Sequence, residues 1–517
     1  MKKVIIAASV LILSVGLVTG CTDTTVSTAT NGEFEGKSVV ASENVAEETT
    51  YGAPAKLGYM DPLLSQIVCQ GVITIEQSRL MLPLIEAAES TEAGVEKSVA
   101  DGIIDAETGK IVVLMLAQGK QPDPDVANKM EDDLLAAIGY SAVEGGFPIP
   151  GTNVTKFYGD DSEIPEPAKA EGRTPNEDYY GQDGHYFTPC SYTDNGDGTV
   201  TDNITGLTWQ VDFGEKITWE TAMNGLDEFN EQALGGYSDW RVPTIKELYS
   251  LVQFTGSMGH TEETCIPFFD TDYFTLSYGT APGDRLIDSQ MCTSTIYDSV
   301  AFESQTTMSG YNFADGRIKG YPAAKLFYCI HVRGNTHYGQ NLFVDNGDGT
   351  ISDLATGLIW MTYDAGYYGH GDIGDGTMNW KDALAYCERL QFAGHGDWRL
   401  PNAKELQSIV DYHRTPGTTD SPAIDSLFQC TEITNQAGMK DWGFYWSASP
   451  FSERASVYVG FGRGMGAMGN EPMDVHGVGC QRSDPRVGSR ADYPSNGGPQ
   501  GDAVRVYNMV RAVRYIK

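Results

Sequence analysis

Two segments of the chain alternate hydrophobic and polar positions around an Asn-Gly pair, which is the pattern of a β-hairpin. Residues 194–209 read DNGDGTVTDNITGLTW, and residues 345–360 read DNGDGTISDLATGLIW. An Asn-Gly pair between alternating runs indicates two antiparallel strands joined by a tight turn. The same hairpin is therefore predicted at two places in the chain.

A second pair of matching blocks follows the hairpins in the same order. Residues 239–248 read DWRVPTIKEL, and residues 397–406 read DWRLPNAKEL. Each block contains a capping pair with a polar N-cap residue and a Glu three residues later, which predicts the start of a helix. The pairs are Thr244 with Glu247 and Asn402 with Glu405.

Helical spacing of apolar residues also predicts a helix between the two marker blocks of each half, near Thr218 to Gln232 and near Trp380 to Leu390. Two marker blocks in the same order, repeated over more than about a hundred residues, indicate a whole domain duplicated in tandem. We expect a first copy at 186–336 and a second copy at 337–517. Each should close on a strand, Ile330 to Arg333 and Val510 to Arg514.

The N-terminus has the pattern of a bacterial export signal. Lys2 and Lys3 precede an apolar run from Val4 to Val18, which is short for a membrane span. The run ends in Leu-Val-Thr-Gly-Cys21, which resembles the lipobox of bacterial lipoproteins. This resemblance implies cleavage of residues 1–20 and lipidation of Cys21, and hence a lipid anchor in the membrane. Thr22 rather than Asp favours the outer membrane or cell surface as the location in the cell envelope.

Three further regions separate this leader from the duplicated part. Residues 21–56 are polar and poor in aromatic side chains, so we expect a disordered tether. Residues 57–145 predict a small helical hairpin region, because Gly71 to Leu82 matches Gly102 to Val113, with Thr74 or Asp105 as helix caps. Residues 146–185 contain many prolines and acids and predict a linker.

The composition limits the partners of the protein. A formal charge of -35 repels nucleic acid, so no nucleic-acid partner is expected. No cofactor motif, no HExxH pattern and no GxSxG elbow is present. The DNGDG segments do not fit an EF-hand loop, because Thr193 and Ile204 would occupy the first and last ligand positions. A turn whose Asp side chains accept backbone N–H groups explains them without a metal.

The order of DNGDGTxxDxxTGLxW, DWRxPxxxEL, YWSAS and VRAVR resembles the Lcl C-terminal domain. This bacterial family, named for a collagen-like adhesin, has many members without an assigned function. The resemblance implies an α+β fold of two tandem C-type-lectin-like domains preceded by the small helical region. It also implies binding rather than catalysis. The first copy departs in its last third, where Met291-Cys-Thr-Ser stands in place of Tyr445-Trp-Ser-Ala.

The matched aromatic and basic residues of the two copies have two interpretations. The tryptophans could stack on sugars, but their repetition at fold landmarks favours core packing. Arg241 and Arg399 could bind an acid, or their stems could pack on aromatic rings. The tryptophans are Trp209, Trp219, Trp240, Trp360, Trp380 and Trp398.

The 462–505 loop of the second copy is the predicted ligand-binding element. It concentrates positive charge on an acidic chain, and functional residues favour loops. The alternative is a solvated loop whose arginines pair with Asp484, Asp492 and Asp502. If the loop is exposed, replacement of its arginines should leave the melting temperature nearly unchanged. The candidate ligand-binding residues are Arg463, Arg482, Arg486, Arg490, Tyr493 and Asn496.

Export makes disulfides the default expectation for the eight cysteines after Cys21. The expected pairs are Cys190 with Cys329, Cys265 with Cys292, and Cys430 with Cys480. Related domains often pair a helix cysteine with one in the last strand, where this chain has Ala512. The resemblance therefore implies that Cys387 is free.

Three functions follow from these observations. The first is a surface-anchored lipoprotein that displays two lectin-like domains and binds an extracellular glycan or protein. The second is a structural envelope protein that assembles with partner proteins. The third and weakest is an enzyme of the formylglycine-generating type, whose paired reactive cysteines have no matching motif here. The sequence therefore favours a protein that is not an enzyme, and it leaves the oligomeric state open.

Overall fold

The computed structural model describes most of the chain beyond residue 146. The described ranges are 146–169, 176–279, 284–297, 306–367, 369, 375–469, 471–493 and 501–516, with scattered residues between 73 and 113. The described residues all fall within one compact unit, whose bounds are Gly52 and Lys517. The leader with Cys21, the tether, Cys69 and Thr74 lie outside the described residues. The predictions made for these residues remain predictions.

The N-terminal helical region contains helix α4 (Thr91–Ala100), which Ser90 caps through its side chain. Gly102 follows the helix with φ of +73°, a conformation that glycine adopts without strain. Asp105 Oδ1 then accepts a hydrogen bond from the Thr108 backbone N–H at 2.7 Å. The predicted Asp105 cap is therefore confirmed.

The two predicted hairpins form equivalent four-stranded antiparallel sheets. The first has the order β12-β5-β4-β3 and the second β13-β14-β15-β23. Val332 pairs with Trp209 in the first sheet, and Val513 pairs with Trp360 in the second, so the closing strands have the same register. The strands are β3 (Tyr192–Asp194), β4 (Thr199–Asp202), β5 (Thr208–Gln210), β12 (Val332–Arg333), β13 (Phe343–Asp345), β14 (Thr350–Asp353), β15 (Leu358–Met361) and β23 (Val513–Tyr515).

The DNGDG turns are held by their own Asp side chains, as predicted. Asp194 Oδ1 accepts the Gly196 backbone N–H at 2.8 Å, and Asp345 Oδ1 accepts that of Gly347 at 2.9 Å. Gly196 has φ of +73°, which explains why glycine follows Asn in the turn.

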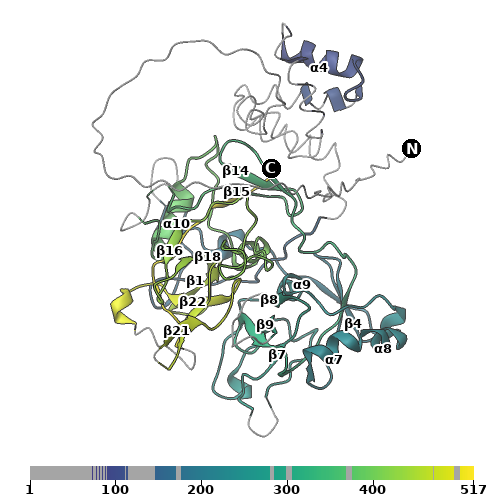
Figure 1. Cartoon of the computed structure of the whole chain (residues 1–517), viewed down its shortest axis with the longest axis vertical. Helices are drawn as coiled ribbons and strands as arrows, with labels where there is room; N and C mark the ends of the chain where they lie inside the picture. Colours follow the sequence, from purple (N-terminus) through teal and green to yellow (C-terminus); the bar gives the residue numbers. More distant parts are fainter. Residues whose placement is uncertain are drawn as a thin grey trace, which may run out of the picture. The chain divides into compact units, whose positions relative to one another are not determined.

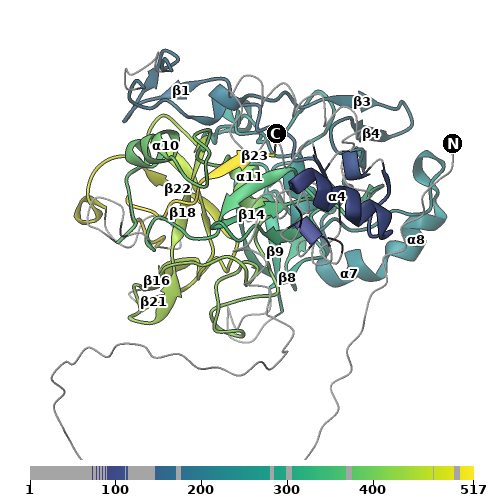
Figure 2. The same ribbon diagram turned by 90° about the horizontal axis from the view of Figure 1, so that it is seen from above.

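The predicted helices form with the predicted caps. In the first copy Gly225 interrupts the first helix, which becomes α7 (Trp219–Asn224) and α8 (Leu226–Glu231). The second copy has an unbroken α10 (Trp380–Arg389). Capping boxes start α9 (Ile245–Ser250) and α11 (Ala403–Ser408), which confirms both predicted capping pairs. In Figure 2, α10 lies against the sheet that contains β18 and β22, in agreement with the contacts between α10 and β18.

A seven-stranded sheet contains strands from both copies and joins them (Figure 1). Its order is β18-β19-β22-β10-β9-β7, with β8 also paired to β9. The junction is the antiparallel pair β10–β22, where Ile318 faces Gln481. The strands are β7 (Gln290–Met291), β8 (Ile296–Tyr297), β9 (Thr307–Asn312), β10 (Arg317–Pro322), β18 (Phe444–Pro450), β19 (Ala455–Gly460) and β22 (Gln481–Pro485).

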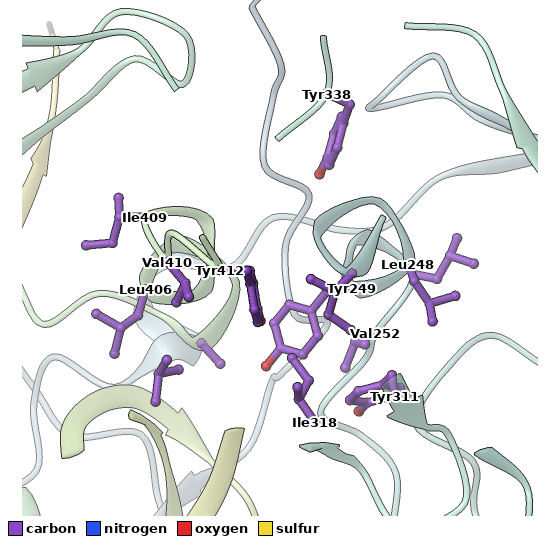
Figure 3. Close-up of a cluster of buried hydrophobic side chains, with 14 of the residues drawn as sticks. Leu248, Tyr249, Val252, Tyr311, Ile318, Tyr338, Leu406, Ile409, Val410 and Tyr412 are labelled. Carbon is purple, nitrogen blue, oxygen red and sulfur yellow. The ribbon is translucent and has the colours of Figure 1, made fainter. Parts of the chain in front are cut away.

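The capped helices α9 and α11 pack against each other over this sheet, and a shared apolar core surrounds them. Figure 3 shows Tyr249 and Tyr412 side by side between the two helices. Both side chains are almost fully buried, as is Ile318 at the strand junction. The copies therefore share one core, and burying this apolar surface stabilises them as a pair.

The segment 146–185 is more than the predicted linker, because its described residues pack into both copies. The Phe147 backbone N–H donates to Ala355 O at 2.7 Å. Asp183 is buried and accepts hydrogen bonds from Thr152 and Ser449. Lys404 Nζ donates to Gly151 O and to Ser250 O, both at 2.7 Å. Burial of these polar groups requires the segment to fold with the domains.

Short elements complete the described structure. They are two-stranded ribbons and short 3-10 turns. They are β1 (Phe157–Tyr158), β2 (Glu163–Ile164), η1 (Asp183–Tyr186), β6 (Ile217–Thr218), η2 (Leu234–Gly236), η3 (Glu262–Thr264), β11 (Leu326–Phe327), β16 (Glu432–Thr434), β17 (Lys440–Trp442), β20 (Met465–Met468), β21 (Glu471–Asp474) and η4 (Arg490–Asp492).

Candidate ligand-binding site

A cavity of about 450 Å³ opens in the second copy beside the first residues of β18. It is bounded by the β16 ribbon, by the residues before α10 and by the segment that leads into the closing strand. We call it the β18 pocket. Its lining combines a cation, a carboxylate, a phenol and amides with apolar side chains: Asp375, Thr377, Ile433, Thr434, Gln436, Gly443, Phe444, Arg505, Tyr507, Asn508 and Met509.

The backbone at the centre of this wall is strained. Val506 has φ of +66°, which is a rare conformation for a β-branched residue. Such a conformation costs about 1–3 kcal/mol and persists only where the surroundings hold it. Here the Asp484 carboxylate on β22 holds it, accepting the backbone N–H groups of Arg505 at 3.1 Å and Val506 at 3.2 Å.

The same carboxylate also orients the next polar side chain of the wall. Asp484 Oδ2 accepts a third hydrogen bond from Asn508 Nδ2 at 3.0 Å. Asp484 is 1% exposed, and burial raises the pKa of its carboxyl to about 6, although the three hydrogen bonds act in the opposite direction. A buried acid on a rigid strand thus fixes the wall.

The residues on either side of the strained position line the pocket. Val506 is fully buried, whereas its neighbours Arg505 and Tyr507 are only partly buried and line the cavity. The Arg505 guanidinium lies over the Phe444 ring, 3.6 Å from its centroid. Stacking on an aromatic ring restricts the arginine and keeps its planar donors in a defined orientation.

The pocket also contains amide acceptors that lack a protein donor. Gln436 Oε1 and Asn508 Oδ1 are buried and have no hydrogen-bond partner among the described residues. Leaving a buried acceptor unsatisfied costs about 1–3 kcal/mol. Donors on a bound molecule would satisfy these oxygens, so the pocket suits a ligand that carries hydroxyl or N–H groups.

The first copy does not have these residues. The common register of the closing strands places Arg505 opposite Ala324 and Tyr507 opposite Leu326 in the alignment of the copies. A methyl group and an isobutyl group cannot supply the guanidinium and phenol donors. The β18 pocket is therefore a property of the second copy.

A second cavity, of about 470 Å³, lies between the copies next to α9. Its lysine and its arginine are already engaged with protein acceptors. Lys246 Nζ donates to Gly339 O at 3.1 Å and to Asn341 Oδ1 at 2.9 Å. Arg241 forms an ion pair with Glu247. Since its cations have partners, this cavity offers fewer binding groups than the β18 pocket.

The structure gives Arg486, one of the predicted binding residues, a scaffold position. Its side chain is 1% exposed and donates to the backbone carbonyls of Ser452, Glu453 and Ala455 at 2.5–2.8 Å. It also donates to Gly159 O at 3.1 Å. The expectation of an exposed residue on a solvated loop is wrong here, because Arg486 follows directly after strand β22.

Arg482 is likewise inside the protein. It lies within β22, is 6% exposed and forms an ion pair with Asp502. Asp502 also accepts from His476 Nε2 at 2.6 Å, and these partners lower the pKa of its carboxyl against the effect of burial. The alternative prediction of arginine pairing with loop acids is thus correct for Arg482, although the pair is buried rather than solvated.

The remaining predicted loop residues do not converge on a site. Arg463 Nη1 donates to Lys440 O at 3.1 Å, and Tyr493 OH donates to Val487 O at 2.9 Å. Arg490 begins the η4 turn, and Asn496 lies outside the described residues. The predicted loop does contribute one residue to the β18 pocket. This residue is Arg505 at the end of the loop, which was not among the predicted ligand-binding residues.

Comparison with known proteins supports this two-copy organisation. A family model described as the Lcl C-terminal domain matches residues 198–333 and 349–478. The chain belongs to this family. No curated protein and no solved structure matched the chain. Within the described residues, no helix of this Lcl-family protein is long and apolar enough to cross a membrane, and no cluster of three or more His, Cys, Asp or Glu side chains is arranged to hold a metal ion.

The marker residues of the two Lcl C-terminal domains have structural roles. Five of the six matched tryptophans are at most 2% exposed, and Trp219 is partly buried. Arg399 forms a two-point ion pair with Glu405, with N–O distances of 2.5 and 2.6 Å. Its guanidinium also lies 4.5 Å from the centroid of the Tyr515 ring. Core packing is the correct interpretation for the tryptophans, and aromatic contact is confirmed for Arg399. In both copies the capping glutamate adds an ion pair with the arginine.

The predicted disulfide pairs are not formed in the structure. All seven cysteines in the described part of the chain are unbonded, including Cys387. Cys190 Sγ donates to Gly151 O at 3.4 Å, and Cys265 Sγ accepts from Gly259 N at 3.3 Å. Cys430 accepts from Arg511 Nη2 at 3.3 Å. Among the described residues, no contact joins the sulfur atoms of a predicted pair: Cys190 with Cys329, Cys265 with Cys292, or Cys430 with Cys480.

The sequence contained a signal for the pocket residues that the loop prediction did not use. The two copies agree at their landmark residues and differ in loop charge. The residues directly before the closing strand differ between the copies at the positions of Arg505 and Tyr507. A position-by-position comparison there would have selected these two side chains.

Proposed function

We propose that the protein is a lipid-anchored envelope protein that binds an extracellular glycan through the β18 pocket of its second Lcl C-terminal domain. The observation that carries this proposal is the strained Val506 backbone, which Asp484 holds and which presents Arg505 and Tyr507 to the pocket. Strain of this kind is concentrated at ligand-binding and active sites.

The chemistry of the lining favours a hydroxyl-rich ligand. Phe444 and Ile433 supply apolar surface, while Gln436 Oε1 and Asn508 Oδ1 supply buried acceptors. Sugars combine apolar ring faces with hydroxyl groups that both donate and accept, so they match this mixture of groups. A protein ligand that offers a polar side chain is the alternative within the same function.

A C-type-lectin-like arrangement is part of the proposal. Each closing strand pairs with the third strand of its sheet, β12 with β5 and β23 with β15, which brings the ends of each domain together. Long irregular segments then connect the helices to the larger sheet and form the pocket wall. The proposal is one of binding, without a catalytic step.

Display at the outer membrane or cell surface is proposed from the N-terminal sequence. The lipobox-like segment ending at Cys21 implies a lipid anchor. The polar residues 21–56 would act as a tether between this anchor and the rest of the protein. Replacement of Cys21→Ser should release the protein from membranes or leave an uncut precursor. A variant that fractionates and migrates like the wild type would contradict the anchor.

A glycan array tests the binding function directly. Full-length protein extracted from membranes should bind a discrete set of glycans, and the Arg505→Ala variant should lose those signals by tenfold or more. The matched control is Arg454→Ala, because Arg454 is exposed and lies outside the pocket. Absence of array signals together with co-purified envelope proteins would instead support a structural role.

A further inference from the structure

Two cysteines of the first Lcl C-terminal domain lie on neighbouring backbone segments. Cys292 follows β7, and Cys329 follows β11. Met291 and Tyr328 form a parallel bridge, and the Cys292 backbone N–H donates to Tyr328 O at 2.9 Å. Paired strands are about 4.8 Å apart, which lies within the Cα–Cα range of disulfides.

The side chains of these two cysteines meet in a dry environment. Cys292 is 0% and Cys329 2% exposed, and both belong to the same small apolar cluster with Val242, Met308 and Phe327. A hydrogen bond with Cys292, together with burial, raises the pKa of the Cys329 thiol. The two thiols therefore lie within reach of each other, and Cys329 Sγ also donates to Ile330 O at 3.9 Å.

The second Lcl C-terminal domain fills the same space differently. The common register places Trp446 opposite Cys292 and Val510 opposite Cys329. Trp446 is fully buried, and its Nε1 donates to Met378 O at 2.8 Å. Where the second copy packs an indole against a valine, the first copy packs two thiols. The cysteine pair is therefore specific to the first copy.

We propose that Cys292 and Cys329 are joined by a disulfide in the exported protein. The reaction is thiol–disulfide exchange with an oxidised dithiol protein of the export compartment. One cysteine thiolate attacks a sulfur of that disulfide and displaces its partner thiolate. The second cysteine then attacks the mixed disulfide, so the chain loses two electrons and two protons while the partner becomes a dithiol.

Exchange must precede closure of the fold. In the folded chain both sulfurs are buried, and the thiol form of Cys329 is favoured, so attack on an external disulfide is slow. During folding the same thiols are accessible. The link is therefore formed while the β7 and β11 segments come together.

The link would restrain the junction between the copies. The chain between Cys292 and Cys329 contains β8, β9 and β10, and β10 pairs with β22 of the second copy through Ile318 and Gln481. Closing this loop covalently reduces the conformational freedom of the unfolded chain. Reduction of this disulfide should therefore increase the rate of backbone hydrogen exchange in β10 and β22 more than in strands β13, β14 and β15.

Peptide mapping tests the proposal, which rests on the proposed export. Full-length protein is extracted with iodoacetamide and digested without reduction. A Cys292–Cys329 linked peptide that disappears with dithiothreitol is expected, whereas Cys387 should be alkylated once the protein is denatured. Recovery of Cys292 and Cys329 as alkylated peptides from protein with a processed leader would overturn the proposal.

A refolding experiment tests this proposal independently of export and of ligand binding. The reduced full chain is refolded with reduced and oxidised glutathione, and the same linked peptide is expected. Dithiothreitol should lower the melting temperature of the wild type and the Cys387→Ala variant by several degrees, and leave that of Cys292→Ala unchanged. Equal responses of the wild type and Cys292→Ala, or no linked peptide after refolding, would also overturn it.

Discussion

The Asp484 carboxylate accepts the backbone N–H of Val506 at 3.2 Å, and Val506 has φ of +66°. A buried acid on a central strand thus holds a rare backbone conformation on the wall of a pocket. The arrangement links the scaffold to the site, because β22 is also the strand that pairs with the first copy through Gln481. The pocket wall is therefore attached through Asp484 to the sheet that joins the two copies.

Asp484 should make stability depend on pH. Its folded-state pKa of about 6 is above its ordinary value of 3.8, so the folded state binds the proton more tightly. The contribution to stability is full below about pH 4 and is lost as the pH rises through 6. A two-unit shift corresponds to roughly 3 kcal/mol. Urea denaturation should show that Asp484→Asn removes this part of the dependence, and identical pH slopes in wild type and variant would contradict it.

Arg486 should be a stability residue. Replacement with Ser leaves four backbone carbonyls without their charged donor, one of them the buried Gly159 O, and removes the packing of the guanidinium 4.9 Å from the Trp380 ring centroid. We expect a loss of about 3–5 kcal/mol in chemical denaturation. The exposed control Arg454→Ser should cost less than about 0.5 kcal/mol. A similar melting temperature for both variants would contradict the scaffold role of Arg486.

The two capping glutamates form a matched pair for measuring burial. The side chains of Arg399 and Glu405 are 3% and 4% exposed, whereas Arg241 is 23% exposed. Glu405→Gln should therefore cost about 3–5 kcal/mol, because it leaves a buried guanidinium without its counter-charge. Glu247→Gln should cost about 1–2 kcal/mol, because Arg241 keeps two backbone carbonyl partners and solvent. Equal losses in urea titrations would show that burial does not set the cost.

Local sequence patterns predicted the local elements well. The DNGDG turns and both capping boxes formed where expected, since each depends on residues a few positions apart. The helix near Thr218 formed with one difference, a break at Gly225 that the period alone did not show. Non-local features were missed for a physical reason. Nothing adjacent to Ile318 or Gln481 encodes that their strands pair across two domains.

The candidate site illustrates the same limit. Charge concentration selected Arg482 and Arg486, but loop membership was inferred from composition, and β22 runs through the predicted loop. Arg482 of β22 pairs with Tyr458 of β19, and Arg486 follows directly after β22, so the inward direction of both side chains depends on long-range strand pairing. Asp484 was assigned only as a possible salt-bridge partner. Its contact with the Val506 backbone required the fold.

The most direct test of the account exchanges pocket residues between the copies. The double variant Arg505→Ala, Tyr507→Leu gives the second copy the side chains that the first copy has at those positions, Ala324 and Leu326. We predict that the affinity for the best array glycan, measured by calorimetry, falls tenfold or more, about 1.4 kcal/mol or greater, while cooperative folding is retained. Unchanged affinity in a folded double variant would contradict the claim that the β18 pocket is the binding site.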